Sequence, residues 1–138
     1  MSCLFCEIAA RRVPAEIVYE DDLAVAFLDH RPVFAGHVLL VPRTHVITLA
    51  ELPAGEVGPL FQLTQRLEVA VERGLEADGT FIAINNIVSQ SVPHLHIHIV
   101  PRRKKDGLKG FFWPRAPYRD DAHLQETAAK IRSAVPRA

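Results

Sequence analysis

The segment His94–Val100 reads His-Leu-His-Ile-His-Ile-Val, so three histidines alternate strictly with branched apolar residues. Alternation with a period of two is typical of a β-strand whose two faces differ. We therefore expect Leu95, Ile97 and Ile99 to enter a core and the three imidazoles to stand together on the opposite face. An ordinary solvent-facing strand carries Thr, Lys, Glu or Ser. Three histidines on one face instead favour a metal site, a phosphate site or a nucleophile.

Apolar patterning elsewhere in the chain predicts an α+β fold. Four further strands are expected where short apolar runs lie between turn residues, at residues 17–19, 23–29, 37–41 and 81–84. Apolar residues at helical spacing predict one long helix from Leu60 to about Leu75. The glycines and prolines within residues 53–59 are assigned to a loop before that helix.

Two shorter helices and the end of the histidine strand complete the predicted fold. A helical turn is expected within Cys3–Arg12 and a final short helix at Asp121–Val135. Pro101 is expected to end the histidine strand, because proline cannot donate to a sheet ladder. The short connections favour antiparallel pairing. The predicted architecture is an antiparallel sheet of about five strands with one long helix packed on it.

Length and charge limit the possible partners. The 138 residues are expected to form a single domain over residues 1–138. The formal net charge is zero, so we expect neither a nucleic acid nor a membrane partner. Residues 71–138 hold eleven basic and seven acidic side chains, which suits an anionic ligand, although solvated surface arginines are the commoner reason for such an excess. The N-terminus lacks the pattern of a secretory signal, so the predicted location is cytoplasmic.

Two cysteines and a histidine are candidate metal ligands. Cys3 and Cys6 form a C-x-x-C pair, and His45 lies just past a predicted strand. Thiolate and imidazole are the ligands that zinc prefers, and a fourth could come from the histidine strand. In a reducing compartment such a pair is more typical of a metal or redox site than of a structural disulfide. A redox pair and a metal-free pair therefore remain the alternatives.

His96 is a candidate nucleophile. A neutral imidazole nitrogen can attack phosphorus without first losing a proton, and the resulting phosphoramidate is reactive enough to be released. His98, on the same face, could bind phosphate oxygens. Further hydroxyl and amide groups precede the strand, at Ser91, Gln90 and Asn85. The sequence has no Walker-type glycine-rich loop, so any phosphate site must be made by side chains and by the turn before His94.

Several of these polar residues also have ordinary structural interpretations. Asp29 could be a simple turn residue, and Asn85 with Asn86 could cap a strand end. The basic stretch Arg102–Lys105 is more often a solvated loop than a site. The aromatic cluster Phe111–Trp113, next to a proline, favours a docking surface over a strand interior.

The chain resembles the histidine-triad (HIT) superfamily of nucleotidyl hydrolases and transferases. His94–Val100 contains the family's pattern of three histidines separated by apolar residues. Cys3–Ile8 is similar to the N-terminal zinc-binding segment of many bacterial members. Three further family blocks occur in the same order, at residues 19–22, 26–29 and 36–45. The resemblance covers about residues 3 to 113.

The resemblance implies a HIT-like fold, a purine nucleotide pocket and a covalent nucleotidyl-histidine intermediate. The nucleophile would be His96, with its other ring nitrogen held by a backbone carbonyl, and His98 and Ser91 would contact the phosphate and the leaving group. Zinc would have a structural role, and the mechanism would need no catalytic metal. The zinc ligands would be Cys3, Cys6, His45 and His94. The nucleotide contacts would be Phe27 at the base, Asp29 at the ribose, and Asn85 and Gln90 near the phosphate. A homodimer with a sheet continued across the interface is also implied.

One segment departs from the family pattern. Members usually carry Asn-x-Gly-x-x-Ala-Gly-Gln-Ser/Thr-Val before the motif, whereas residues 85–92 read Asn-Asn-Ile-Val-Ser-Gln-Ser-Val, with Ser89 at a usual glycine position. The departure leaves the nucleophile in place but affects the expected leaving-group preference. It also motivates an alternative, a nucleotide-binding sensor or interaction module with negligible catalysis. A galactose-1-phosphate uridylyltransferase-like enzyme is disfavoured, because that branch has glutamine at the position of His98.

Overall fold

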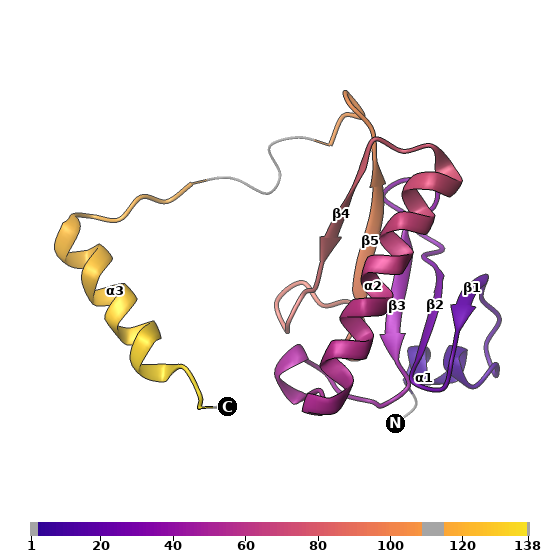
Figure 1. Cartoon of the computed structure of the whole chain (residues 1–138), viewed down its shortest axis with the longest axis horizontal. Helices are drawn as coiled ribbons and strands as arrows, with labels where there is room; N and C mark the ends of the chain where they lie inside the picture. The colour runs from indigo at the N-terminus through magenta and orange to yellow at the C-terminus, as the bar shows by residue number, and fades with distance from the viewer. Residues whose placement is uncertain (1–2, 109–114, 138) are drawn as a thin grey trace. The chain divides into compact units, whose positions relative to one another are not determined.

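The computed structural model describes residues 3–108 and 115–137, and its chain forms two compact units, Met1–Asp106 and Gly107–Ala138 (Figure 1). The first unit holds the sheet and the predicted site. The second holds one helix. A single domain over the whole chain stays a prediction, and the proposed aromatic docking surface at Phe111–Trp113 lies outside the described residues.

The first unit is built on a five-stranded antiparallel sheet, which confirms the predicted α+β class. The strands follow the spatial order β1-β2-β3-β5-β4, with antiparallel pairing at every step. The elements in chain order are α1 (Leu4–Ala9), β1 (Ile17–Glu20), β2 (Ala24–Leu28), β3 (Val38–Pro42), the 3-10 turn η1 (Leu49–Glu51), α2 (Ala54–Leu75), β4 (Gly79–Ala83) and β5 (Ile97–Arg102).

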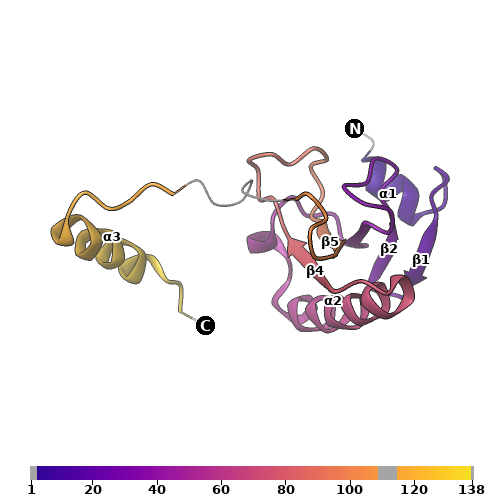
Figure 2. The same ribbon diagram turned by 90° about the horizontal axis from the view of Figure 1, so that it is seen from above.

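The long helix α2 covers one face of this sheet, as Figure 2 shows from above. Its buried residues recur at helical spacing, at Leu60, Leu63, Leu67 and Val71. They pack in one cluster with alternate residues of the central strands and with the segment before β5, namely Ala24, Ala26, Val38, Leu40, Leu95, Ile97 and Ile99. The period-two pattern of the strands therefore sets which residues meet the helix.

The short helix α1 covers the other face. Phe5 and Ile8 are its buried residues, and they form a second cluster with Val25, Phe27, Leu39 and Val41. Strands β2 and β3 are thus buried on both faces, which agrees with their continuous apolar sequences. The small second core matters because it lies on the side of the sheet that carries the histidines.

The histidine strand differs from its prediction in three ways. It begins at Ile97, so His94 and His96 precede the strand and only His98 lies within it. Leu95, Ile97 and Ile99 do face the α2 core, but the imidazole face is also covered, and His94 and His96 are buried. Pro101 does not end β5, which continues to Arg102. Because β3 begins at Val38, opposite Ile99, the strand beyond Ile99 pairs only with β4. Pro101 therefore lies at an edge-like position, where a missing N–H is tolerated.

The long helix begins earlier than expected. Residues 54–59, assigned to a loop, form the first turns of α2, with Pro59 inside the helix. Pro53 fixes the chain direction at the N-cap, and its carbonyl accepts a hydrogen bond from Glu56 N (2.8 Å). Val57 packs against the core. These contacts outweigh the loss of one helical hydrogen bond at Pro59, a loss that is best tolerated near a helix N-terminus.

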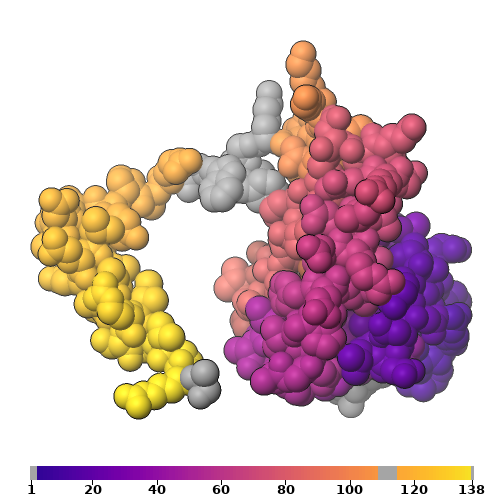
Figure 3. All heavy atoms as spheres, in the orientation of Figure 1, coloured from indigo at the N-terminus to yellow at the C-terminus, as the bar shows by residue number. Residues whose placement is uncertain are grey.

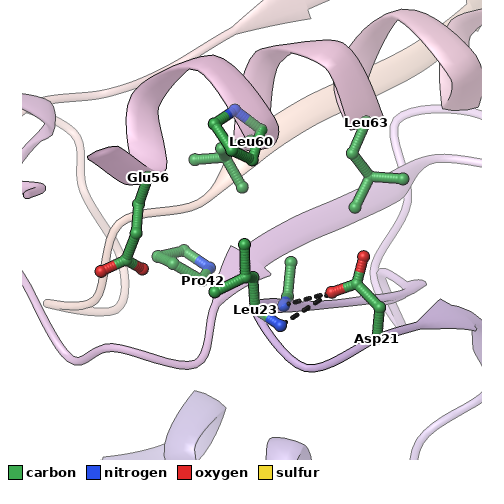
Figure 4. Close-up of a pocket in the computed structure, with 8 residues that line it drawn as sticks. Asp21, Leu23, Pro42, Glu56, Leu60 and Leu63 are labelled. Atoms are coloured by element: carbon green, nitrogen blue, oxygen red, sulfur yellow. Dashed lines mark hydrogen bonds between the residues drawn. The ribbon is translucent and has the colours of Figure 1, made fainter. Parts of the chain in front are cut away.

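The start of the sheet is tied to α2 at the surface. The guanidinium of Arg66 lies 5.2 Å from the centre of the Tyr19 ring. Figure 3 shows the N-terminal part of the chain, in indigo, lying against the magenta part. A hollow of about 20 Å³ lies below the first turns of α2, between Asp21, Leu23 and Pro42 (Figure 4). It has room for about one water molecule, so it is not a ligand site.

The second unit contains α3 (Asp121–Ala134), which confirms the predicted final helix. Asp120 caps it, because its carboxylate accepts a hydrogen bond from His123 N at 2.8 Å. Among the residues that the structure describes, no helix is long and apolar enough to cross a membrane.

Replacing Gly36 should destabilise the first unit. Gly36 has φ +99°, and a Cβ there would overlap Cδ1 of Leu75. We expect Gly36→Ala to lower the free energy of unfolding by about 1–2 kcal/mol, measured by urea denaturation. Gly74→Ala is the matched control, because Gly74 lies within α2 with nothing near its missing Cβ, and it should stabilise by about 0.5–1 kcal/mol. Equal effects at both positions would contradict this explanation.

Candidate functional site

Two thiols and two imidazoles converge beside the N-terminus of α1. Cys3 is the N-cap of α1 and Cys6 lies within that helix, while His45 follows β3 and His94 precedes β5. Nδ1 of His94 lies 3.3 Å from Cys3 Sγ, 3.5 Å from Cys6 Sγ and 3.1 Å from His45 Nδ1. All four donor atoms lie within 4.8 Å of one another, so the cluster could hold a metal ion.

The orientation of His94 suits a metal ligand. Its Nε2 lies 2.8 Å from the carbonyl oxygen of Pro42, so Nε2 carries the proton and donates. Nδ1 is then left with a lone pair directed at the two thiols. Burial lowers the pKa of His94, so the ring is neutral, as coordination requires. The donor separations are close to the edges of a tetrahedron built from Zn–S and Zn–N bonds of about 2.3 and 2.0 Å.

A cavity of about 1140 Å³ opens on the α1 face of the sheet. Five predicted site residues line it, namely Phe27, Asp29, Ser91, His96 and His98. The sequence analysis missed the opposite wall, which α1 and the loop after it supply through Leu4, Phe5, Ile8, Pro14 and Ala15. Their apolar spacing indicated only a short helix, and nothing in it pointed to a ligand. The cavity is therefore apolar at one end and polar at the histidines, as small-molecule sites commonly are.

His96 presents a free nitrogen to this cavity. Its Nδ1 lies 2.7 Å from the carbonyl oxygen of His94, so Nδ1 carries the proton and donates. Nε2 is left with the lone pair, which is the form that a nucleophile needs. The Phe5 ring packs edge-on against the imidazole, with ring centres 5.0 Å apart, and holds it in place. The backbone carbonyl expected beside the nucleophile is thus the carbonyl of the preceding histidine.

His98 is bonded to a histidine that the sequence analysis did not select. His37 was treated as the start of a strand, but its Nε2 lies 2.9 Å from Nδ1 of His98. Burial, with smaller contributions from His96 and His37, lowers the pKa of His98 to about 4. Its Nε2 is buried and has no hydrogen-bond partner among the described residues. Such an atom at a cavity wall is suited to meet a ligand.

Asp29 and the residues before the histidine strand have contacts of their own. Asp29 lines the cavity, and its Oδ1 also accepts a hydrogen bond from Arg31 N at 2.9 Å, so it is a turn residue as well. The side-chain amide of Gln90 donates to Ile47 O (2.7 Å) and accepts from Ile87 N (3.2 Å). Neither Gln90 nor Asn85 is among the residues that line the cavity. Their nucleotide contacts stay predictions.

Comparison with known proteins decides the family. The HIT domain family matches residues 10–105. This chain belongs to the HIT family. An uncharacterised HIT-like protein of Mycobacterium tuberculosis is 38% identical over 125 residues, which are 87% of each chain. Adenosine 5′-monophosphoramidase hnt1 of Schizosaccharomyces pombe is 30% identical over 96% of this chain and all of its own. Adenylylsulfatase HINT3 of Arabidopsis thaliana is 31% identical over 98% of this chain and 68% of its own.

Solved structures of HIT proteins agree with the fold. A HIT family protein from Bacillus subtilis superimposes with a TM-score of 0.89 at 31% identity, over the whole of both chains. A zinc-bound histidine triad protein from Mycobacterium smegmatis has a TM-score of 0.74 and 38% identity, over 98% of this chain and 99% of its own. The predicted HIT-like fold and the predicted family are both confirmed.

The segment that departs from the HIT pattern has an unusual backbone. Ile87 and Ser89 have φ values of 69° and 63°, in the left-handed region that glycine tolerates best. Ser89 stands where the family usually has glycine, so the chain keeps a conformation suited to glycine without having one. Hydrogen bonds hold the segment in place. Leu49 N donates to the Asn86 side chain (3.0 Å), and Gln90 bonds to Ile47 O.

Restoring glycine at residue 89 should stabilise the protein. A left-handed L-residue costs about 1–2 kcal/mol, and part of this is offset by the greater flexibility of unfolded glycine. We expect Ser89→Gly to raise the free energy of unfolding by about 0.5–1 kcal/mol in urea denaturation. Ser89→Ala is the control, because it removes the hydroxyl but keeps the Cβ, and it should bring no comparable gain. A gain of equal size in Ser89→Ala would show that backbone conformation is not the cause.

Proposed function

We propose that this chain is a nucleotidyl hydrolase that acts at the α-phosphate of purine nucleotide derivatives through a covalent intermediate on His96. The observation that carries this proposal is the lone pair of His96 Nε2, directed into a cavity large enough for a nucleotide. The names of the relatives support the same class of chemistry, since they include a phosphoramidase and an adenylylsulfatase.

The proposed reaction has two displacement steps. Nε2 of His96 forms a bond to the α-phosphorus while the bond from phosphorus to the leaving nitrogen or oxygen breaks. The leaving atom takes up a proton that comes from solvent. In the second step the oxygen of a water molecule bonds to phosphorus, the P–Nε2 bond breaks, and the water releases a proton. The net reaction consumes one water molecule and yields a nucleoside monophosphate and the protonated leaving group.

The other cavity residues have separate roles in this proposal. Phe27 lines the base end, and the Asp29 carboxylate would accept hydrogen bonds from the ribose hydroxyls. His98 and Ser91 line the same cavity as His96 and would donate to the phosphate and the leaving group. Asn85 and Gln90 would act near the phosphate end of the cavity. Substrate candidates are nucleoside phosphoramidates, aminoacyl-adenylates and dinucleoside polyphosphates.

We assign zinc to the cluster of Cys3, Cys6, His45 and His94 as a structural ion. The four donors leave no open position for a substrate, which is typical of structural sites. The ion would join α1, the end of β3 and the start of the histidine segment, and the hydrolysis would need no catalytic metal. A homodimer and a cytoplasmic location belong to the same proposal.

A nucleotide sensor with negligible catalysis is the second candidate. It is favoured by the segment before the motif. There the side-chain amide of Gln90 is hydrogen-bonded to backbone atoms, and Ser89 stands where the family pattern has glycine. The cavity and the nucleotide contacts would be the same in both candidates. The two candidates differ in whether a covalent bond forms between Nε2 of His96 and the α-phosphorus.

The first experiment tests the covalent step. We expect the wild-type protein to hydrolyse adenosine 5′-phosphoramidate, and His96→Ala to lower the rate by roughly 10³-fold or more, because the attacking atom is gone. Mass spectrometry after rapid quenching should find the nucleotidyl adduct on wild-type protein only. His123→Ala, in the other unit of the chain, is the control. Nucleotide binding without an adduct, with any turnover independent of His96, would favour the sensor.

The second experiment tests the metal. Protein purified without chelator should contain about one zinc ion per chain by elemental analysis, and the double variant Cys3→Ser, Cys6→Ser should lose it. The same variant should unfold at a lower temperature, because the ion no longer joins α1 to the sheet. His123→Asn, which lies outside the cluster, is the control and should keep its zinc. Full zinc content in the double variant would rule out this ligand set.

A further inference from the structure

One wall of the cavity ends in a carboxylate that has no role in the proposed reaction. This wall runs from α1 to the start of β1 and lines the cavity through Leu4, Phe5 and Ile8 and then through residues 13–16. Among the described residues of the wall that line the cavity, Glu16 is the one with a polar side chain. The wall is therefore apolar along most of its length and offers side-chain hydrogen-bond acceptors at one place.

A backbone contact fixes where this side chain begins. Leu28 N donates to Glu16 O at 2.9 Å, next to the pairing of Ile17 with Phe27 in the β1–β2 ladder. Leu28 lies between Phe27, at the proposed base end, and Asp29, the proposed ribose contact. Glu16 is thus joined across the ladder to the residue between those two contacts.

The carboxylate of Glu16 is available to a ligand. Its oxygens have no hydrogen bond and no ion pair with any residue that the structure describes. Two basic residues, His30 and Arg31, also line the cavity, but they follow the ribose contact Asp29 in the chain. Glu16 is the ionisable group on the opposite wall, beside the apolar residues that would hold the base.

A purine base has apolar faces and a polar edge, and the two common purines differ at that edge. Guanine presents two adjacent donors, N1–H and the 2-amino group. Adenine presents the N1 acceptor beside the 6-amino donor. A carboxylate accepts both donors of guanine as a bidentate pair. Against adenine it accepts one hydrogen bond, and its second oxygen meets the lone pair of N1, which is repulsive.

We propose that Glu16 is a specificity-determining residue that selects guanine over adenine at the base end of the cavity. Its two oxygens accept hydrogen bonds from N1–H and the 2-amino group, while the apolar wall before it packs against the face of the base. This inference rests on the proposed function for the presence of a nucleotide. Base selection is a property of binding, however, so it does not depend on turnover or on a covalent intermediate.

The exposure of Glu16 limits the size of the preference. A bidentate contact between a side chain and a base typically discriminates by about 5- to 150-fold. Glu16 is exposed, so water screens its charge and weakens the pair. We therefore expect a preference near the lower end of this range, about tenfold. Adenine derivatives then remain substrates with reduced affinity.

The first test compares the affinities of nucleoside 5′-monophosphates for the wild-type protein by isothermal titration calorimetry. These compounds are products of the proposed reaction, so turnover does not interfere. We expect GMP to bind about tenfold more tightly than AMP, with IMP, which lacks the 2-amino group, between them. Equal affinities for GMP and AMP overturn the proposal and leave the hydrolase intact. Binding of none of the three refutes the nucleotide site itself, and base selection with it.

The second test changes one atom of the carboxylate. Glu16→Gln keeps the length and shape of the side chain but turns one oxygen into an amino donor. The amide then matches adenine, with a donor for N1 and an acceptor for the 6-amino group. We expect this variant to bind AMP at least as tightly as GMP. Glu126→Gln makes the same change in the other unit of the chain and should keep the wild-type ratio. If Glu16→Gln keeps a tenfold preference for GMP, Glu16 does not read the base and the proposal is wrong.

Kinetics with guanosine and adenosine 5′-phosphoramidates separate base reading from general damage. We expect the wild-type protein to favour the guanosine compound through a lower KM, with similar kcat values, because the base is bound equally in the ground state and the transition state. Glu16→Ala should raise KM for the guanosine compound to that for the adenosine compound. A fall in kcat for both substrates with an unchanged KM ratio would indicate a structural role and contradict the proposal.

Discussion

The hydrogen bond from His96 Nδ1 to the His94 carbonyl is the contact on which the site depends. It is 2.7 Å long, buried and local, and it leaves the other ring nitrogen free to face the cavity. The neighbouring histidine uses the reverse arrangement, since His94 donates through Nε2 to Pro42 and directs Nδ1 at the thiols. His98 is bonded to His37 through Nδ1. Three identical side chains in one short segment, two just before β5 and one within it, become chemically different through the atom that each one engages.

The chemical difference among the three histidines depends on both faces of the sheet being covered. Without α1, the histidine face of the sheet would be open to water. Phe5 and Ile8 close that face, and the resulting desolvation lowers the pKa values of His37, His94 and His98. The same helix, with its N-cap residue Cys3, supplies a wall of the cavity and both thiols that could hold a metal. One six-residue helix therefore shapes the electrostatics and the ligand pocket together.

Much of this arrangement could be predicted from the sequence, because the side chains involved are chemically distinctive. Cysteine, histidine and strict alternation predicted Cys3, Cys6, His45 and one strand histidine as ligands and His96 as a nucleophile, and the family resemblance assigned the fourth ligand to His94. Apolar patterning predicted the five strands and three α-helices that the structure describes, but not η1 or the first turns of α2. Contacts between distant segments could not be predicted. His37 is unremarkable at the start of an apolar strand, and only the β3–β5 pairing brings it to His98. The cover by α1 was missed because alternation of polar and apolar residues usually indicates a solvent-exposed face.

The two sides of β5 are both buried but differ in chemistry, and this limits the insertions and deletions that the sequence can accept. In any strand with one apolar face, a shift of one residue moves the apolar set out of the core and the other set into it. Here a one-residue shift would place the imidazoles in the aliphatic core beneath α2 and the aliphatic side chains on the α1 face. A single insertion or deletion within residues 94–100 would therefore disrupt the core and the site together, whereas a substitution such as His96→Ala removes only one side chain.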